Sequence, residues 1–188
     1  MIIAQQKRQE NIAEYLLYLW QVEDLLRACK LDIDTVDQVI ISRYEVDDKT
    51  RHDIREWYES LIKMMELENV RDKGHLRICH NVLIRLNDLH QQLLADQGRF
   101  PDYHADYYLT LPHIVQLRAS MPEQERPNEL EMCFNALYGV MLLHLQGKEI
   151  SQDTAAAISQ ISHFIGMLAA YYKRDEEKPL FGNDLSDN

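Results

Sequence analysis

Three titratable side chains fall on helix faces that are otherwise apolar, and these are the residues that could do chemistry. Glu23 lies on the apolar side of the first predicted helix, and His90 and His144 lie on the apolar arcs of two later helices. A lone buried acid is costly, so it often marks a site. One hypothesis is an interior polar pocket in which Glu23, His90 and His144 meet. The alternative is structural, with Glu23 paired to Arg27 four residues on and with hydrogen-bonded core histidines.

The histidines and cysteines do not have the spacing of a known metal or catalytic motif. A di-iron helical bundle requires Glu-x-x-His pairs and a zinc protease requires His-Glu-x-x-His, and neither occurs among the eight histidines. Cys79 and His90 lie about 16 Å apart along one predicted helix, so they cannot share an ion. Gly-rich phosphate loops and Gly-x-Ser-x-Gly are also absent from the sequence. We therefore predict no metal and no cofactor, and favour a non-catalytic protein over an enzyme.

The cysteines and the N-terminal segment indicate a soluble cytoplasmic protein. Cys29, Cys79 and Cys133 are far apart, odd in number and set in apolar helical contexts, which is typical of reduced core thiols. The polar residues 5–10 interrupt any apolar run that could act as a secretory signal. The longest strongly apolar stretch, residues 140–145, is too short to span a bilayer.

Composition predicts an all-α fold, a single-domain bundle of six or seven helices with the N-terminal helix central. Of 188 residues 46% are hydrophobic, only 6 are Gly and 5 are Pro, and no segment alternates with period two. We expect residues 1–174 to form the helical domain and residues 175–188 to be a frayed polar tail pinned by Leu180 and Phe181. The expected helices cover about 3–29, 34–44, 48–68, 75–97, 102–119 (kinked or divided at Pro112), 128–146 and 151–173.

The charge of the chain limits its partners. The formal net charge is −11, and an acidic chain repels phosphate backbones and anionic lipids. We therefore expect neither nucleic acid nor a membrane as partner, but a second copy of the chain or another protein.

Small residues recur along one stripe of the last predicted helix. Ala155, Ser159, Ser162 and Gly166 lie beside its apolar face at helical spacing. Small side chains allow another helix to approach closely. That helix belongs either to the same chain or to a second copy in a homodimer.

The N-terminal string resembles a known family. Residues 4–8 and 10–18, with Trp20 and the closing Tyr171-Tyr172-Lys173, are similar to an uncharacterised Bacteroidetes family catalogued as a domain of unknown function. The resemblance covers most of the chain and implies a bacterial single-domain protein. It implies no activity, cofactor or residue role.

The function that the sequence favours is a cytoplasmic helical interaction module that forms a homodimer and has no catalytic activity. The alternative is a helical bundle that binds or converts a small molecule in an interior polar pocket.

Overall fold

The computed structural model describes residues 2–181, except the side chains of Ile2 and Glu125, and its regular structure in this range consists of helices joined by short loops. The described residues contain eight α-helices, two short 3₁₀ helices and no strand, so the all-α prediction is confirmed and the helix count exceeds the expected six or seven. The α-helices are α1 (Ile2–Glu10), α2 (Ile12–Ala28), α3 (Ile33–Val39), α4 (Asp48–Leu67), α5 (Arg77–Ala95), α6 (Pro101–Ala119), α7 (Glu129–Leu145) and α8 (Gln152–Glu177).

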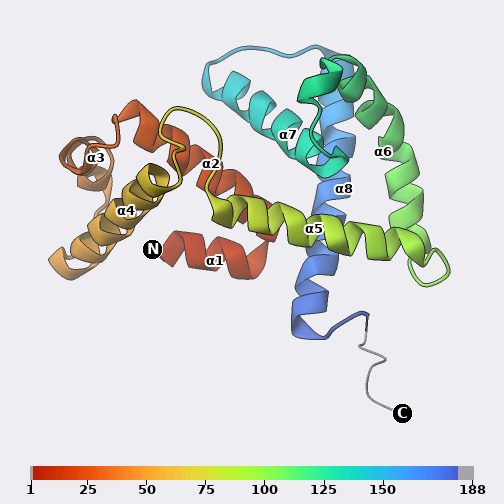
Figure 1. Ribbon diagram of the computed structural model, residues 1–188, viewed down its shortest axis with the longest axis horizontal. Coiled ribbons are helices and arrows are strands. Elements are labelled where there is room, and N and C mark those ends of the chain that lie inside the picture. The colour runs from red at the N-terminus through yellow and green to blue at the C-terminus, as the bar shows by residue number, and fades with distance from the viewer. Residues whose placement is uncertain (1, 182–188) are drawn as a thin grey trace. The chain divides into compact units, whose positions relative to one another are not determined.

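The extra helix arises because the predicted N-terminal helix is interrupted at Asn11. This residue separates α1 from α2 (Figure 1). Its Oδ1 accepts a hydrogen bond from the backbone N of Ala13 at 3.0 Å. An asparagine side chain competes with the helix for hydrogen bonds to nearby backbone groups, which makes asparagine a good N-cap residue and a poor helix-interior residue. One continuous helix over residues 3–29 is therefore wrong, while its central place in a bundle stays a prediction.

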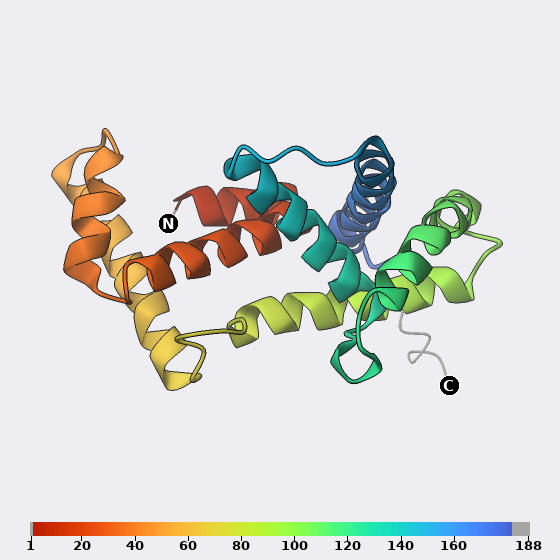
Figure 2. The same cartoon turned by 90° about the horizontal axis from the view of Figure 1, so that it is seen from above.

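The chain forms two compact units, which we describe separately. The first contains α1, most of α2, α3, α4 and the start of α5. Here α3 packs beside α4 (Figure 2), and Arg55 of α4 bonds Asp34 of α3 at 2.7 Å. The side chains of Leu16, Trp20 and Tyr58 are almost completely buried in this unit. Burial of such large side chains supplies most of the stabilisation.

The second unit is built on α8, which packs against α6 and α7. Phe134, Phe164 and Tyr103 are fully buried in it. The segment that contains Pro112 is one helix, α6, rather than two. Helices α7 and α8 begin at capping side chains, because Asn128 accepts from the backbone N of Glu131 and Ser151 from that of Thr154.

Helix α8 of the second unit ends a few residues later than the sequence predicted. Helix α8 continues to Glu177, with Tyr172 Oη donating to Glu176 Oε1 at 3.0 Å one turn later. The carbonyl of Leu180 accepts from Arg99 Nη2 at 2.8 Å, and the rings of Phe181 and Phe100 lie 5.4 Å apart. The predicted contacts of Leu180 and Phe181 are thus present. Residues 182–188 of the predicted tail lie outside the described residues.

Candidate functional site

Glu23 is a buried acid held by the segment that begins α5. Its side chain is only 2% exposed. Oε2 accepts from Nδ1 of His75 at 2.6 Å, and Oε1 accepts from the backbone N of Leu76 at 2.9 Å and from Sγ of Cys79 at 3.4 Å. Because free N–H groups and the helix dipole favour negative charge at a helix start, the carboxylate is stabilised there.

Arg27, one turn after Glu23, does not form the ion pair that the sequence offered as an alternative. Its Nη1 bonds Asp24 Oδ1 at 2.8 Å, and its Nη2 donates to the carbonyls of Val70, at 3.1 Å, and Gly74. Gly74 has a φ of +86°, a backbone conformation that residues other than glycine rarely adopt. Glu23 and Arg27 together fasten the α4–α5 connection to α2.

The imidazole of His75 connects this buried carboxylate to the surface. Its ring stacks on Trp20 with centroids 4.2 Å apart and planes 14° apart, and its side chain is 25% exposed. The ring of His80, an exposed residue of α5, lies 6.5 Å away, centroid to centroid. The sequence analysis missed both histidines, because each lies on or just before a helix start where the apolar period is not yet visible.

The surroundings of Cys79 disfavour its thiolate form. Burial, and then the nearby carboxylate of Glu23, raise the pKa of its thiol far above the usual range. Since the thiolate is the reactive form, the thiol is inert. The cysteines Cys29, Cys79 and Cys133 are all free and buried, as predicted for core thiols.

His90 belongs to an aromatic cluster of the second unit. Its Nδ1 lies 2.7 Å from Oη of Tyr103, and its ring meets Tyr107 and Phe164 edge-on. Burial lowers the pKa of His90 from 6.5 to about 4, so the imidazole is neutral at pH 7. His90 is therefore a buried histidine with a hydrogen-bond partner, as the structural interpretation of the sequence describes.

His144 lies at the surface, which differs from its expected interior position. It is exposed in the last turn of α7, whereas the buried residues of this helix are confined to its first half. The partners of Glu23 come from the first unit and those of His90 from the second. A pocket that joins Glu23, His90 and His144 stays a prediction.

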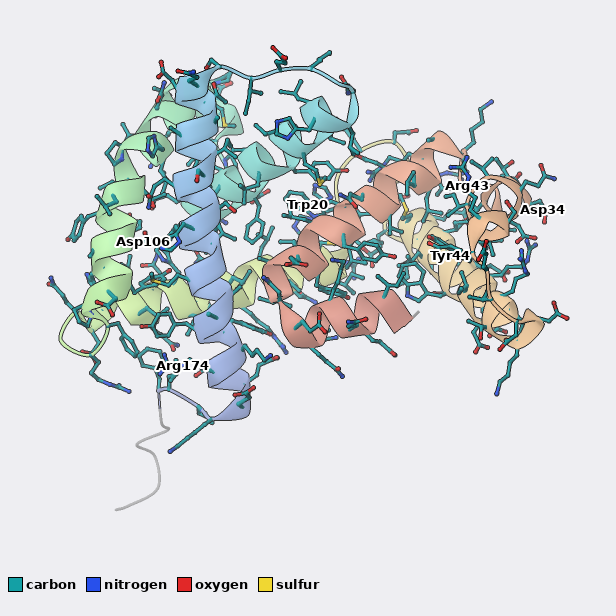
Figure 3. The ribbon with its side chains drawn as sticks, turned by 180° about the vertical axis from the view of Figure 1, so that it is seen from behind. Trp20, Asp34, Arg43, Tyr44, Asp106 and Arg174 are labelled. Atoms are coloured by element: carbon teal, nitrogen blue, oxygen red, sulfur yellow. The ribbon has the colours of Figure 1, made fainter. Side chains whose placement is uncertain are left out.

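A second buried acid, which the sequence analysis did not identify, lies where α6 meets α8 (Figure 3). Asp106 is 5% exposed, and its Oδ1 accepts from Gln160 Nε2 at 2.9 Å. The same amide donates to Thr110 Oγ1 at 3.1 Å, and Nε2 of the exposed His163 lies 3.6 Å from Asp106 Oδ1. Among the described residues Asp106 Oδ2 has no partner. The sequence feature that could have identified Asp106 as buried is the four-residue spacing of Asp106, Thr110 and Ile114, which places all three on one face of the helix.

The small-residue stripe of α8 faces outward. Ala155, Ser159, Ser162 and Gly166 are all exposed, and a Cβ added at Gly166 would meet no atom within 4 Å. One of the two possibilities was that a helix of the same chain packs closely against these small residues. Among the described residues no helix does so.

The outer face of α6 is apolar as well. Tyr108, Leu109 and Val115 are 60%, 64% and 58% exposed. The end of α6 and the start of α8 enclose a groove of about 710 Å³, lined by exposed Gln116 and Ala156 among others. Neither the three exposed residues of α6 nor the small-residue stripe of α8 lines this groove, whose lining includes the charged residue Asp153.

With the geometry known, comparison with other proteins places the chain in a family. The family described as a domain of unknown function, DUF4924, matches residues 1–179. The chain belongs to the DUF4924 family. No curated protein and no solved structure is similar to this DUF4924 chain at a significant level. The family confirms the resemblance to a domain of unknown function and assigns no role to any residue.

Within residues 2–181, no three His, Cys, Asp or Glu side chains converge in a way that could hold a metal ion. In the same range, no helix has the length and apolar character needed to cross a membrane.

Proposed function

We propose that this protein is a non-catalytic helical interaction module of the bacterial cytoplasm and that it pairs with a second copy of itself through the outer face of α8. The observation that carries the proposal is the exposure of the small-residue stripe, defined by Ala155, Ser159, Ser162 and Gly166. It runs about 16 Å along the helix. Because the distance between packed helices depends on the side chains at the contact, such a stripe permits a close approach.

The distribution of charge supports a second copy as the occupant. The chain carries a formal net charge of −11, but residues 107–117, 132–147 and 154–172 contain no Asp, Glu, Lys or Arg. Two acidic copies repel each other wherever their acidic surfaces meet. A two-fold symmetric contact places the same patch of both copies face to face, so only an uncharged patch avoids that repulsion.

The outer face of α6 extends the uncharged surface. Tyr108, Leu109 and Val115 expose large apolar groups there. Contiguous exposed apolar surface on a globular protein marks interaction sites.

Light scattering of tag-free protein, compared with a Gly166→Leu variant, tests the proposal. The native protein should have twice the chain mass of 22.2 kDa. Gly166→Leu should increase the dimer dissociation constant at least tenfold and leave the monomer folded, because its added side chain points into open space. Gly139→Leu in α7 is the matched control, since a Cβ added at Gly139 also meets nothing within 4 Å and the helix propensity changes equally.

Two outcomes contradict the proposal. One is a native protein that stays at the mass of a single chain at all concentrations. The other is a dimer that Gly166→Leu and Gly139→Leu weaken equally, because a contact through the α8 stripe requires only the first to act.

A further inference from the structure

The start of α5 brings two imidazoles together above a buried carboxylate. His75 precedes the helix by two residues and His80 lies in its first turn, with ring centroids 6.5 Å apart and planes at 67°. Both side chains reach solvent, His75 in part and His80 fully. Neither residue has a role in the proposed dimer, so this pair is a separate feature of the molecule.

The hydrogen bond to Glu23 selects one tautomer of His75. A carboxylate only accepts, so Nδ1 of His75 carries the proton that it donates to Glu23 Oε2 at 2.6 Å. The lone pair of the neutral ring is then on Nε2, the nitrogen left for a ligand. Metal-binding histidines almost always donate their other ring N–H to a carboxylate or carbonyl in this way.

The surroundings of His75 fix the direction of the ring. Trp20 is 1% exposed and stacks on the imidazole at 4.2 Å, while Glu23 is held in turn by the backbone N of Leu76. A ligand that is oriented before the ion arrives loses little entropy when it binds. His80 is the adaptable partner, because its exposed ring can turn towards His75.

From this arrangement we infer that His75 Nε2 and the imidazole of His80 bind one borderline transition-metal ion of the Cu²⁺, Ni²⁺ or Zn²⁺ class. Imidazole nitrogen suits these ions, and metal–nitrogen bonds of about 2.0–2.1 Å require the ring of His80 to turn towards His75, so that the two ring centroids come closer than their present 6.5 Å. Since no third His, Cys, Asp or Glu converges on this pair in residues 2–181, water takes the other coordination positions. Glu23 is a positioning residue that orients His75 without touching the ion.

Trp20 provides the readout for a test, because it stacks directly on the proposed ligand. The chain has two tryptophans, so a Trp57→Phe background leaves Trp20 as the sole indole. In tag-free protein, Cu²⁺ should quench this fluorescence saturably at a one-to-one ratio, and a chelator should restore it. Isothermal titration calorimetry with Zn²⁺ and with Ni²⁺ measures binding to the same site for ions that do not quench by electron transfer.

Three variants of the Trp57→Phe protein distinguish a site from surface adsorption. His80→Ala should raise the quenching midpoint at least tenfold and leave the fold intact, because the side chain is exposed. Glu23→Gln should raise it about tenfold, the usual cost of losing the group that orients a histidine ligand. His52→Ala, which removes an exposed histidine of α4, should leave the midpoint unchanged.

The inference is wrong if His80→Ala, folded by circular dichroism, binds Cu²⁺ and Zn²⁺ with native midpoints. Quenching that does not saturate, or that His52→Ala weakens as much as His80→Ala, would equally contradict it. The dimer mass of the same samples reports separately on the proposed function.

Discussion

At the residue scale, the molecule contains two buried acids whose surroundings differ. Both oxygens of Glu23 accept hydrogen bonds from residues 75–79, so its burial is compensated. Asp106 has partners on Oδ1 alone among the described residues. A buried group whose partners are removed retains the full desolvation cost. Glu23 therefore stabilises the first unit only as long as the α4–α5 connection stays in place.

Replacing Glu23 by Ala should cost about 3 kcal/mol of unfolding free energy, because His75 Nδ1 and the backbone N of Leu76 lose their acceptor inside the protein. Urea unfolding measures the loss. Glu59→Ala is the control, since it removes a surface pair with Lys63 and should cost under about 1 kcal/mol. Equal effects of the two changes would refute the stabilising role of Glu23.

His90 should make the free energy of unfolding decrease as the pH is lowered through the mildly acidic range. Burial lowers its pKa from 6.5 to about 4, so the unfolded chain binds the proton more tightly than the folded one. Stability is then fully present above pH 6.5 and is lost as pH falls towards 4, by about 2 kcal/mol at pH 5. The difference in unfolding free energy between pH 7 and pH 5 should shrink by that amount in His90→Gln. A His52→Gln protein should retain it, and an unchanged difference in His90→Gln would contradict the assignment.

At the scale of elements, most helices are predictable from local chemistry and a few boundaries are not. Capping residues such as Asn128 and Ser151 identify helix starts, because their oxygens accept from backbone N–H groups three residues later. The break at Asn11 is missed because Asn11 follows the polar residues 5–10, and a polar run of this kind is equally typical of an exposed continuous helix. Helix α8 extends beyond its predicted end, because Tyr172 and Glu176 bond within a segment that has lost its apolar period.

Removal of the α7 cap gives a test at this scale. Asn128→Ala should cost about 1 kcal/mol of unfolding free energy, because the backbone N of Glu131 loses the Oδ1 acceptor that lies 2.9 Å away. Asn128→Ser preserves an acceptor and should cost only a few tenths. Thermal unfolding of both variants measures the loss of unfolding free energy, and equal losses would show that the cap contributes nothing.

The candidate sites were harder to predict than the helices. The sequence pattern places Glu23 on an apolar face, but its partners His75 and Leu76 lie more than fifty residues away and only the fold brings them near. The small-residue stripe can be read from the sequence of α8, whereas the direction that it faces depends on which side of α8 the aromatic core of Tyr103 and Phe164 covers. Contacts between distant residues carry no local signal.

At the scale of the whole molecule, the uneven distribution of charge is the property that bears on function. An acidic chain keeps long uncharged stretches on α6, α7 and α8, and parts of α6 and α8 in these stretches are exposed. Net charge elsewhere on the chain opposes contact between two copies at those places. The proposed dimer contact therefore uses the uncharged surface.

A charge placed on that surface should separate the two copies. Leu109→Asp on α6 should lower the dimer fraction, because two acidic groups would then be added to the contact region of an acidic dimer. Leu67→Asp is the matched control, since Leu67 is an even more exposed leucine, 80% against 64%, in the first unit. Sedimentation velocity at several concentrations measures both. A dimer that both variants leave intact would remove α6 from the interface.

The most direct test of the central claim is disulfide cross-linking through the α8 stripe. The native cysteines are buried, so Ser162→Cys provides an accessible thiol on the stripe and Ser60→Cys, also exposed, provides one on α4. A two-fold contact centred on the stripe brings position 162 of both copies close to the symmetry axis. Under mild oxidation, our account predicts a covalent dimer from Ser162→Cys and little from Ser60→Cys. Equal cross-linking of both proteins, or none at position 162, would contradict it.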